Sequence, residues 1–170
     1  MAISNKVEYG FAESPFGTII VARTWDGVCD LQFLDHNRLE TIHELAQRWG
    51  EYTPTTQSNT MAETVERAIF EGYDHPVPLD VKGTDFQKRV WHELRNIPIG
   101  TTVSYQEVAK RIGKPKAVRA VATAIGQNPV AMLIPCHRVV HADGTVGEYH
   151  WGCKLKKRLI EWEKQQVQKP

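Results

Sequence analysis

A cysteine followed directly by a histidine is the pair of residues in this sequence best suited to covalent chemistry. Cys136 and His137 lie in the run Pro-Cys-His-Arg-Val-Val at residues 135–140. Sulfur attacks as the thiolate, and an ordinary cysteine is only slightly ionised at neutral pH, so a nearby base or positive surroundings must lower its pKa. Successive side chains of a strand point to opposite faces, so a relay between these neighbours needs a turn or a bridging water. The pair makes Cys136 a candidate nucleophile, and the alternative is a buried structural thiol, since free cysteine is among the most buried residue types.

The residues around Cys136 predict its place in the fold. An apolar run at 130–134 precedes it, and the turn signal Asp143-Gly144 follows it. We expect a buried strand that ends at Cys136, where the chain bends back to the surface.

Two short helices separated by a glycine are predicted before this segment. Ser104 and Glu107 have the spacing of a capping box, which places the first helix at 105–112, and Gly113 ends it. Pro115 suits the first turn of a second helix at 115–127, which Asn128-Pro129 ends. Helix, glycine turn and helix form the arrangement of a helix-turn-helix.

The second of these helices has an unusual composition. It is rich in alanine, and Lys114, Lys116 and Arg119 make its start basic. Small side chains let a helix approach another surface closely, and cations neutralise phosphates. A tightly packed core helix is the alternative, but the combination with basic residues favours DNA.

The remaining elements divide at a linker. Strands are predicted at 18–24 and 28–34, and helices at 39–49 and 60–70, with a polar, turn-rich segment at 51–59. Two prolines and a glycine mark a linker at 73–83. Beyond it we expect a helix at 84–96 and, after an aromatic and glycine-rich loop at 146–152, a basic helix at 153–164.

The net charge of +1 conceals a strong asymmetry between the two halves. Residues 1–80 carry 5 Lys/Arg and 13 Asp/Glu, whereas residues 81–170 carry 16 Lys/Arg and 7 Asp/Glu. An acidic module is therefore followed by a basic one, and the basic one is a candidate surface for nucleic acid.

Cysteine usage and hydropathy exclude several classes of protein. Cys29, Cys136 and Cys153 are odd in number and lack CxxC spacing, which argues for a reducing compartment and against a disulfide framework or a cysteine-rich metal site. No apolar stretch is long enough for a membrane span, and the first residues lack the apolar region of a signal peptide. We expect a cytoplasmic protein that does not bind membranes.

These segments together resemble the O6-alkylguanine-DNA alkyltransferases, also called methylated-DNA–protein-cysteine methyltransferases. The matching motifs are the run at 135–139, Asn128-Pro129, Ser104-Tyr105-Gln106, the run at 114–121, and the stretch from Gly147 to Glu163. The resemblance covers residues 83–164 closely, whereas the first eighty residues fit only by the arrangement of their elements.

The resemblance implies an α/β fold in two domains. Residues 1–80 would form a ribonuclease-H-like antiparallel sheet with helices, and residues 81–170 a winged-helix-like DNA-binding domain that carries Cys136. It also implies the reaction, in which a methyl or other small alkyl group passes once and irreversibly from O6 of guanine, or O4 of thymine, in double-stranded DNA to Cys136. The damaged base would be flipped out from the minor-groove side. No cofactor or metal is expected, and the protein would act as a monomer.

Individual roles follow from the same resemblance. His137 would take the thiol proton through a water, Glu163 would accept the other imidazole N–H, and Asn128 would brace the turn that carries Cys136. Arg119 would fill the space left by the flipped base and Tyr105 would crowd the phosphate and reach the base. Gln106 and Lys114 would touch the DNA backbone. The base pocket would be lined by Val139, Tyr149 and the backbone of His150. Trp151 stands where the family varies, since some members have glycine there, and we expect its bulky indole at the pocket mouth to restrict substituents larger than methyl or ethyl.

Three rival functions remain open at this point. A non-catalytic binder of alkylated guanine would not need Cys136, and a helix-turn-helix regulator would not need the set of Cys136, His137 and Glu163. A cysteine hydrolase would use the same nucleophile but would turn over many times.

Overall fold

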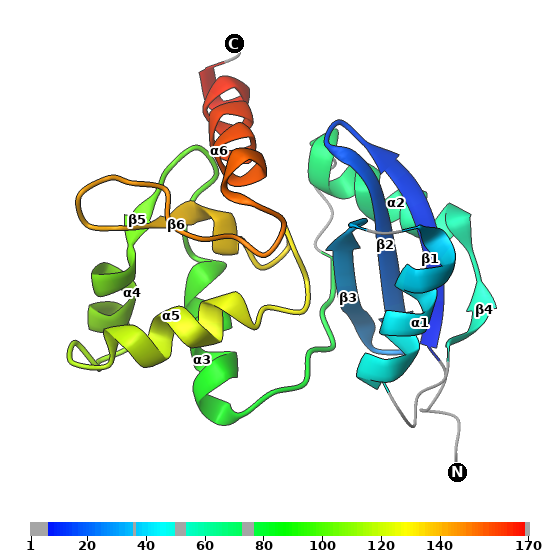
Figure 1. Cartoon of the computed structure of the whole chain (residues 1–170), viewed down its shortest axis with the longest axis horizontal. Coiled ribbons are helices and arrows are strands. Elements are labelled where there is room, and N and C mark those ends of the chain that lie inside the picture. Colours follow the sequence, from blue (N-terminus) through cyan, green and yellow to red (C-terminus); the bar gives the residue numbers. More distant parts are fainter. Residues whose placement is uncertain (1–6, 36, 50–53, 73–76, 169–170) are drawn as a thin grey trace. The chain divides into compact units, whose positions relative to one another are not determined.

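The computed structural model describes residues 7–35, 37–49, 54–72 and 77–168. The chain divides into two compact units, which Figure 1 shows in blue to green and in green to red. The first comprises Met1–Lys82 with Pro129–Ala131, and the second comprises Gly83–Asn128 with Met132–Pro170. The mixture of helices and strands confirms the predicted α/β class.

A four-stranded sheet forms the centre of the first unit in the described part of the chain. Strands β1 (Val7–Ser14), β2 (Gly17–Thr24) and β3 (Gly27–Phe33) form an antiparallel meander, and β4 (Pro54–Gln57) pairs in parallel with β1. The predictions of β2 and β3 are confirmed. The prediction of a turn-rich segment at 51–59 is wrong at Pro54–Gln57, because these residues form β4. This short polar strand lies on the edge of the sheet, where a proline at the first position is tolerated.

Both faces of this sheet are covered by helices. Figure 1 shows α1 (Arg38–Trp49) on one face and α2 (Asn59–Phe70) on the other. Because helices bury both faces of the sheet, apolar residues can occupy every position of a strand instead of every second one. The core under α1 consists of Val7, Phe11, Ile20, Ala22, Cys29, Leu45 and Trp49. Cys29 is therefore a packing residue.

Two later segments of the chain complete the first unit. Within the predicted linker, of which residues 73–76 lie outside the described part, Leu79 pairs with Val28 in an isolated bridge. Val130 pairs similarly with Leu31, whose N–H donates to the Pro129 carbonyl at 3.0 Å. The apolar run at 130–134 thus begins as a bridge in this unit.

The second unit is mainly helical. Its helices are α3 (Asp85–Leu94), α4 (Tyr105–Arg111), α5 (Val118–Gly126) and α6 (Cys153–Gln168), and a short parallel pair joins β5 (Val103–Ser104) to β6 (Val139–Val140). The four predicted helices are confirmed, with differences at their ends. No helix in the described residues combines the length and the hydropathy needed to cross a bilayer.

The capping of these helices differs in part from expectation. Ser104 accepts a hydrogen bond from the Glu107 N–H at 3.0 Å, as predicted, but the Glu107 carboxylate pairs with Arg111 one turn later. The reciprocal capping box lies instead at the start of α3, between Thr84 and Gln87.

The second helix of the pair begins later than predicted. It starts at Val118, and residues 114–117 form a turn closed by a hydrogen bond from the Ala117 N–H to the Lys114 carbonyl. Pro115 fits the tight turn as well as it would fit a first helical turn, so composition did not separate the two. Lys114 and Lys116 therefore precede α5.

The predicted strand before Cys136 is also wrong. Met132 has a φ of +68°, which an extended strand does not allow, and Cys136–Arg138 form one turn of 3-10 helix. Burial explains the error, because the apolar residues at 130–134 pack in turns that a run of hydrophobicity does not distinguish from a strand.

Candidate active site

Cys136 is held at the start of the 3-10 turn by its own backbone and by Asn128. The Cys136 N–H donates to the Ile134 carbonyl at 2.8 Å. The amide nitrogen of Asn128 donates to the same carbonyl at 2.8 Å and to the Cys136 sulfur at 3.2 Å. Asn128 thus fixes the turn and provides a donor to the sulfur, which stabilises its negative form.

His137 and Glu163 form a buried pair beside this turn. Nε2 of His137 lies 2.8 Å from Oε1 of Glu163, and neither side chain is appreciably exposed. A carboxylate only accepts hydrogen bonds, so Nε2 carries the proton and Nδ1 is left as the acceptor. Burial lowers the pKa of His137, which keeps the imidazole neutral. Its Nδ1 is buried and has no hydrogen-bond partner among the described residues, so the imidazole is ready to take a proton there.

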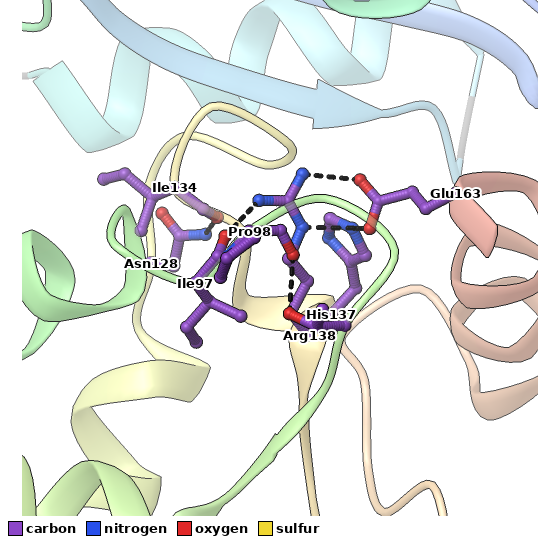
Figure 2. A network of polar contacts seen from close by, with 8 residues as sticks. Ile97, Pro98, Asn128, Ile134, His137, Arg138 and Glu163 are labelled. Atoms are coloured by element: carbon purple, nitrogen blue, oxygen red, sulfur yellow. Dashed lines mark hydrogen bonds and ion pairs between the residues drawn. The ribbon is translucent and has the colours of Figure 1, made fainter. Parts of the chain in front are cut away.

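Arg138 fixes the same carboxylate from the other side, as Figure 2 shows. Its guanidinium donates to both oxygens of Glu163, at 2.9 Å and 2.6 Å, and to the Ile97 carbonyl at 2.7 Å. Burial alone would raise the pKa of Glu163, but the hydrogen bonds from His137 and Arg138 outweigh it and hold that pKa at about 2. Glu163 is therefore ionised and orients the imidazole.

The sulfur has a second electrostatic neighbour in Lys156. Burial raises the pKa of the Cys136 thiol, whereas Asn128 and the Lys156 ammonium act against this rise. Lys156 is itself only 1% exposed, and burial lowers its pKa to about 8. At rest the cysteine is thus a protonated thiol, and its ionisation depends on removal of the proton beside two groups that stabilise the thiolate.

A cavity of about 740 Å³ opens onto the sulfur. Its walls come from the start of α4, from α5, and from the loop before α6. The lining residues are Tyr105, Val118, Arg119, Ala122, Ile125, Gly126, Asn128, Cys136, His141, Glu148, Tyr149, His150 and Trp151. The cysteine is therefore accessible from the side on which the helix-turn-helix lies, although it is 7% exposed. No group of three or more potential metal ligands occurs among the described residues.

Comparison with known proteins places this geometry in a family. Residues 85–165 match the family described as the DNA-binding domain of 6-O-methylguanine DNA methyltransferase. The bifunctional transcriptional activator and DNA repair enzyme Ada of Escherichia coli is 42% identical over 161 residues, which cover 92% of this chain and 45% of Ada. The chain thus spans about half the length of the Ada proteins it matches.

Relatives of similar length match along nearly the whole chain. The methylated-DNA–protein-cysteine methyltransferase of Mycobacterium bovis is 38% identical over 160 residues, which cover 93% of each chain. The crystal structure of Mycobacterium tuberculosis OGT in complex with DNA superposes with a TM-score of 0.76 at 34% identity, covering 94% of each chain. This chain belongs to the methylated-DNA–protein-cysteine methyltransferase family.

Most of the residues to which the resemblance assigned a role in this methyltransferase family surround one cavity. Tyr105, Arg119, Asn128, Cys136, Tyr149, His150 and Trp151 all line it. His137 and Glu163 lie behind the cysteine, in contact with each other. Gln106 and Lys114 are exposed, at the start of α4 and in the turn before α5. Val139 is fully buried in β6, where it pairs with Val103, and is not among the residues that line the cavity.

The loop before α6 forms the aromatic part of the wall. The ring of Trp151 lies edge-on to Tyr149 and to His150, with centroids 5.1 and 4.8 Å apart. The Tyr149 hydroxyl is buried and has no hydrogen-bond partner of ordinary geometry within the described residues. Burial raises its pKa, and the charge of Cys136 and a hydrogen-bond interaction with it raise that pKa further, so this hydroxyl stays protonated beside the sulfur.

Two residues of this family member were missed by sequence reasoning. Arg138 is adjacent to the Cys-His pair, but its partner Glu163 is 25 residues away and only the fold brings them together. Lys156 lies in the basic helix expected at 153–164, where it was given no role, yet its ammonium donates to the Tyr105 hydroxyl and to the Glu148 carbonyl, each at 3.3 Å. The spacing of Leu155, Leu159 and Ile160 could have placed residue 156 near the buried stripe.

Proposed function

We propose that this protein transfers a methyl or other small alkyl group from O6 of guanine in DNA to its own Cys136, once per molecule. O4 of alkylated thymine is a second substrate in this proposal. The observation that supports it best is the position of the Cys136 sulfur, at a cavity whose wall includes α5 of the helix-turn-helix. The cysteine-transfer activity named for the mycobacterial relatives, and the DNA bound in the related complex, agree with this position.

The chemistry is a displacement at carbon. The sulfur of Cys136 attacks the alkyl carbon, the S–C bond forms as the O6–C bond breaks, and the bonding electrons move to O6. Loss of the alkyl group restores the guanine carbonyl once N1 receives a proton, so the thiol proton is balanced by the proton on guanine. The product is a thioether, which has no base-labile bond, and for this reason each molecule acts once.

The proton leaves the sulfur with help from the buried pair. His137 acts as base through its free Nδ1, across a bridging water, and Glu163 holds the imidazole in the tautomer that leaves Nδ1 open. Asn128 donates to the sulfur and braces the turn. Lys156 adds a positive charge that stabilises the thiolate as it forms.

DNA reaches the cavity through extrusion of the damaged nucleotide. Flipping costs a few kcal/mol. Arg119, exposed at the start of α5, fills the vacated stack, and Tyr105 contacts the flipped nucleotide. Gln106 and Lys114 bind backbone phosphates. The small residues on α5, including Ala122 in the cavity wall, let the helix approach the minor groove closely.

The base pocket is formed by the loop before α6. Tyr149, the backbone of His150 and Trp151 contact the flipped base, and Val139 supports the pocket from β6. In this proposal residues 1–80 form a ribonuclease-H-like domain and residues 81–170 the alkyltransferase domain. The protein acts as a cytoplasmic monomer on double-stranded DNA.

One assay tests the proposal against its rivals. The protein is incubated with a duplex that carries a labelled methyl group on O6 of guanine, with Cys136→Ser as control. We expect label on the protein in a ratio of one to one, on the peptide that contains Cys136, and none on the control. A retained complex without label would indicate a non-catalytic binder, and release of many equivalents of label to solution would indicate a hydrolase. Equal affinity for undamaged DNA with no transfer would indicate a regulator.

A further inference from the structure

A carboxylate lies on the wall of the cavity that opens onto Cys136. Glu148, in the loop before α6, is one of the lining residues, and it is exposed. Arg119 is the other lining residue of the described chain whose side chain is charged when histidine is neutral. In the proposed function its guanidinium enters the DNA, in the stack that the flipped base has left. The wall that faces a bound base is then negative.

The Glu148 carboxylate is not neutralised by a neighbouring group. It forms no hydrogen bond and no ion pair with another residue that the structure describes, whereas the Glu163 carboxylate is bound by His137 and Arg138. The Lys156 ammonium donates to the backbone carbonyl of Glu148, at 3.3 Å, and not to its carboxylate. Because this contact is made by the backbone, a substitution of the side chain at residue 148 leaves it in place.

The charge of Glu148 is felt inside the cavity. Burial raises the pKa of the Tyr105 phenol, and the charges of Cys136 and Glu148 raise it further. Tyr105 lines the same cavity, so its phenol lies in the field of both groups. A ligand inside a cavity of about 740 Å³ is closer to the wall than the Debye length of about 8 Å at physiological ionic strength. Salt therefore screens this wall charge only in part.

We propose that Glu148 selects O6 substituents by their charge, and that it disfavours anionic groups such as carboxymethyl and favours cationic groups such as aminoethyl. This inference rests on the proposed function, because it presumes that O6-alkylguanine enters the cavity. The reacting carbon must touch the Cys136 sulfur. The carboxylate of a carboxymethyl group is attached directly to that carbon, and the ammonium of an aminoethyl group is one carbon further away. Either charge is thus inside the cavity with Glu148, which repels the first and attracts the second.

The test compares substituents of equal size and different charge. The duplexes carry, on O6 of one guanine, carboxymethyl or its neutral counterpart carbamoylmethyl, and aminoethyl or its neutral counterpart hydroxyethyl. Transfer to Cys136 is followed in a single turnover at about pH 7, where the carboxylate and the ammonium are charged. The Kd of each duplex is measured by anisotropy in a Cys136→Ala background. The steric effect of Trp151 and the attraction to phosphates are common to both members of a pair, so they cancel in the ratio.

The variant is Glu148→Gln, and the matched control is Asp143→Asn, on the same loop but outside the cavity lining. Asparagine keeps the side-chain oxygen that accepts from the Thr145 N–H, so the turn is retained. In Glu148→Gln the rate ratio of carboxymethyl to carbamoylmethyl should rise about fivefold, the size of one partly screened charge pair. The ratio of aminoethyl to hydroxyethyl should fall by a similar factor, and relative affinities should follow the rates. Asp143→Asn should keep the parent ratios.

The opposite signs distinguish charge from shape. Loss of a charge moves the two pairs in opposite directions, whereas a change in the shape of the pocket moves both in the same direction. Ratios that stay at the parent values in Glu148→Gln, or that move together, would overturn the proposal. Equal shifts in Asp143→Asn would also overturn it, because the effect would then come from the charge of the loop and not from the cavity wall.

The two measurements separate this inference from the transferase function. If no alkyl group reaches Cys136 but the relative affinities shift in opposite directions in Glu148→Gln, charge selection stands and transfer fails. If transfer occurs and the ratios do not depend on Glu148, only charge selection fails. Absence of any preference for these lesion duplexes over undamaged DNA, without transfer, would overturn both.

Discussion

Nε2 of His137 lies 2.8 Å from Oε1 of Glu163, and both side chains are buried in the second unit of the chain. This contact joins the 3-10 turn that carries Cys136 to α6, and Arg138 ties the same carboxylate to the Ile97 carbonyl. The turn that carries Cys136 is therefore fixed by ionic hydrogen bonds from residues that do not line the cavity. Its parts can be tested separately.

Glu163→Gln should slow alkyl transfer while leaving DNA affinity nearly unchanged. An amide can donate as well as accept, so it no longer imposes the tautomer with a free Nδ1, and it removes the charge that favours an imidazolium. We expect a rate loss of about a hundredfold to ten-thousandfold, the range of general base catalysis. Single-turnover label transfer and anisotropy with undamaged duplex measure the two quantities. A parallel collapse of binding would make Glu163 a structural carboxylate.

Glu163 should also contribute stability that is lost in acid. Its folded pKa of about 2 lies below its ordinary value of 4.5, so the folded state favours the ionised form. The contribution is complete above about pH 5 and disappears as the pH falls towards 2, and it amounts to about 3 kcal/mol for a shift of this size in a buried group. Urea unfolding between pH 7 and 3 should therefore show a shallower loss in Glu163→Gln than in the parent. Equal slopes for the two proteins would contradict the depressed pKa.

Lys156→Met should slow transfer and change its pH profile. The buried ammonium is a cation that stabilises the Cys136 thiolate, and its loss should cost about tenfold near pH 7, the equivalent of one pKa unit. Burial lowers the pKa of Lys156 to about 8, so the parent loses this cation above pH 8. The ratio of parent to variant rates should then fall towards one as the pH rises past 8. A constant ratio across this range would exclude the electrostatic role.

The lowered pKa of Lys156 also affects folding stability, but it destabilises the folded state, whereas the lowered pKa of Glu163 stabilises it. A lysine whose folded pKa lies below its unfolded value destabilises the fold while it is charged in both states, fully below about pH 8, and this cost disappears as the pH rises towards 10.5. Lys156→Met should therefore be at least as stable as the parent at neutral pH, although it reacts more slowly.

Local patterns in the sequence were sufficient to predict most of the elements. Apolar spacing identified α1, α2 and α3, and the Ser104 cap placed the start of α4 correctly, because these signals lie within a few residues of the structure they produce. The strand expected before Cys136 was wrong because an apolar run reports burial, whereas the left-handed Met132 that turns the chain leaves no mark in composition.

The site was predictable in part from residue types and in part from the family motif. Cys136 and His137 could be singled out as a candidate nucleophile and base, but Glu163 came from the resemblance, because no periodicity in the sequence connects positions 26 residues apart. Arg138 contacts Glu163, 25 residues away, and Lys156 contacts Tyr105, 51 residues away. A local sequence pattern does not contain contacts over such separations.

Trp151→Gly should widen the range of alkyl groups that react. The indole lines the cavity and is held edge-on against Tyr149 and His150, so it occupies space that a large substituent would need. The ratio of rates for benzylated and methylated guanine should rise by about tenfold or more, as for other changes of pocket size. Trp151→Phe serves as a graded control and should give an intermediate ratio. A parent protein that reacts as fast with benzylguanine as with methylguanine would remove the steric role of Trp151.

Arg119→Ala should weaken repair of a duplex more than reaction with a free modified base. Arg119 is exposed at the start of α5 and lines the cavity, where its side chain can fill the stack behind a flipped nucleotide. Since extrusion costs a few kcal/mol, loss of this support should slow the duplex reaction by about tenfold to a hundredfold. The free base needs no extrusion and should react at the parent rate.

Lys116→Ala, which removes one charge from the turn before α5, is the matched control. It should alter salt-dependent binding without changing the ratio of duplex to free-base rates. Equal losses on duplex and free base in Arg119→Ala would place Arg119 in the structure of the cavity rather than in the stack of the DNA.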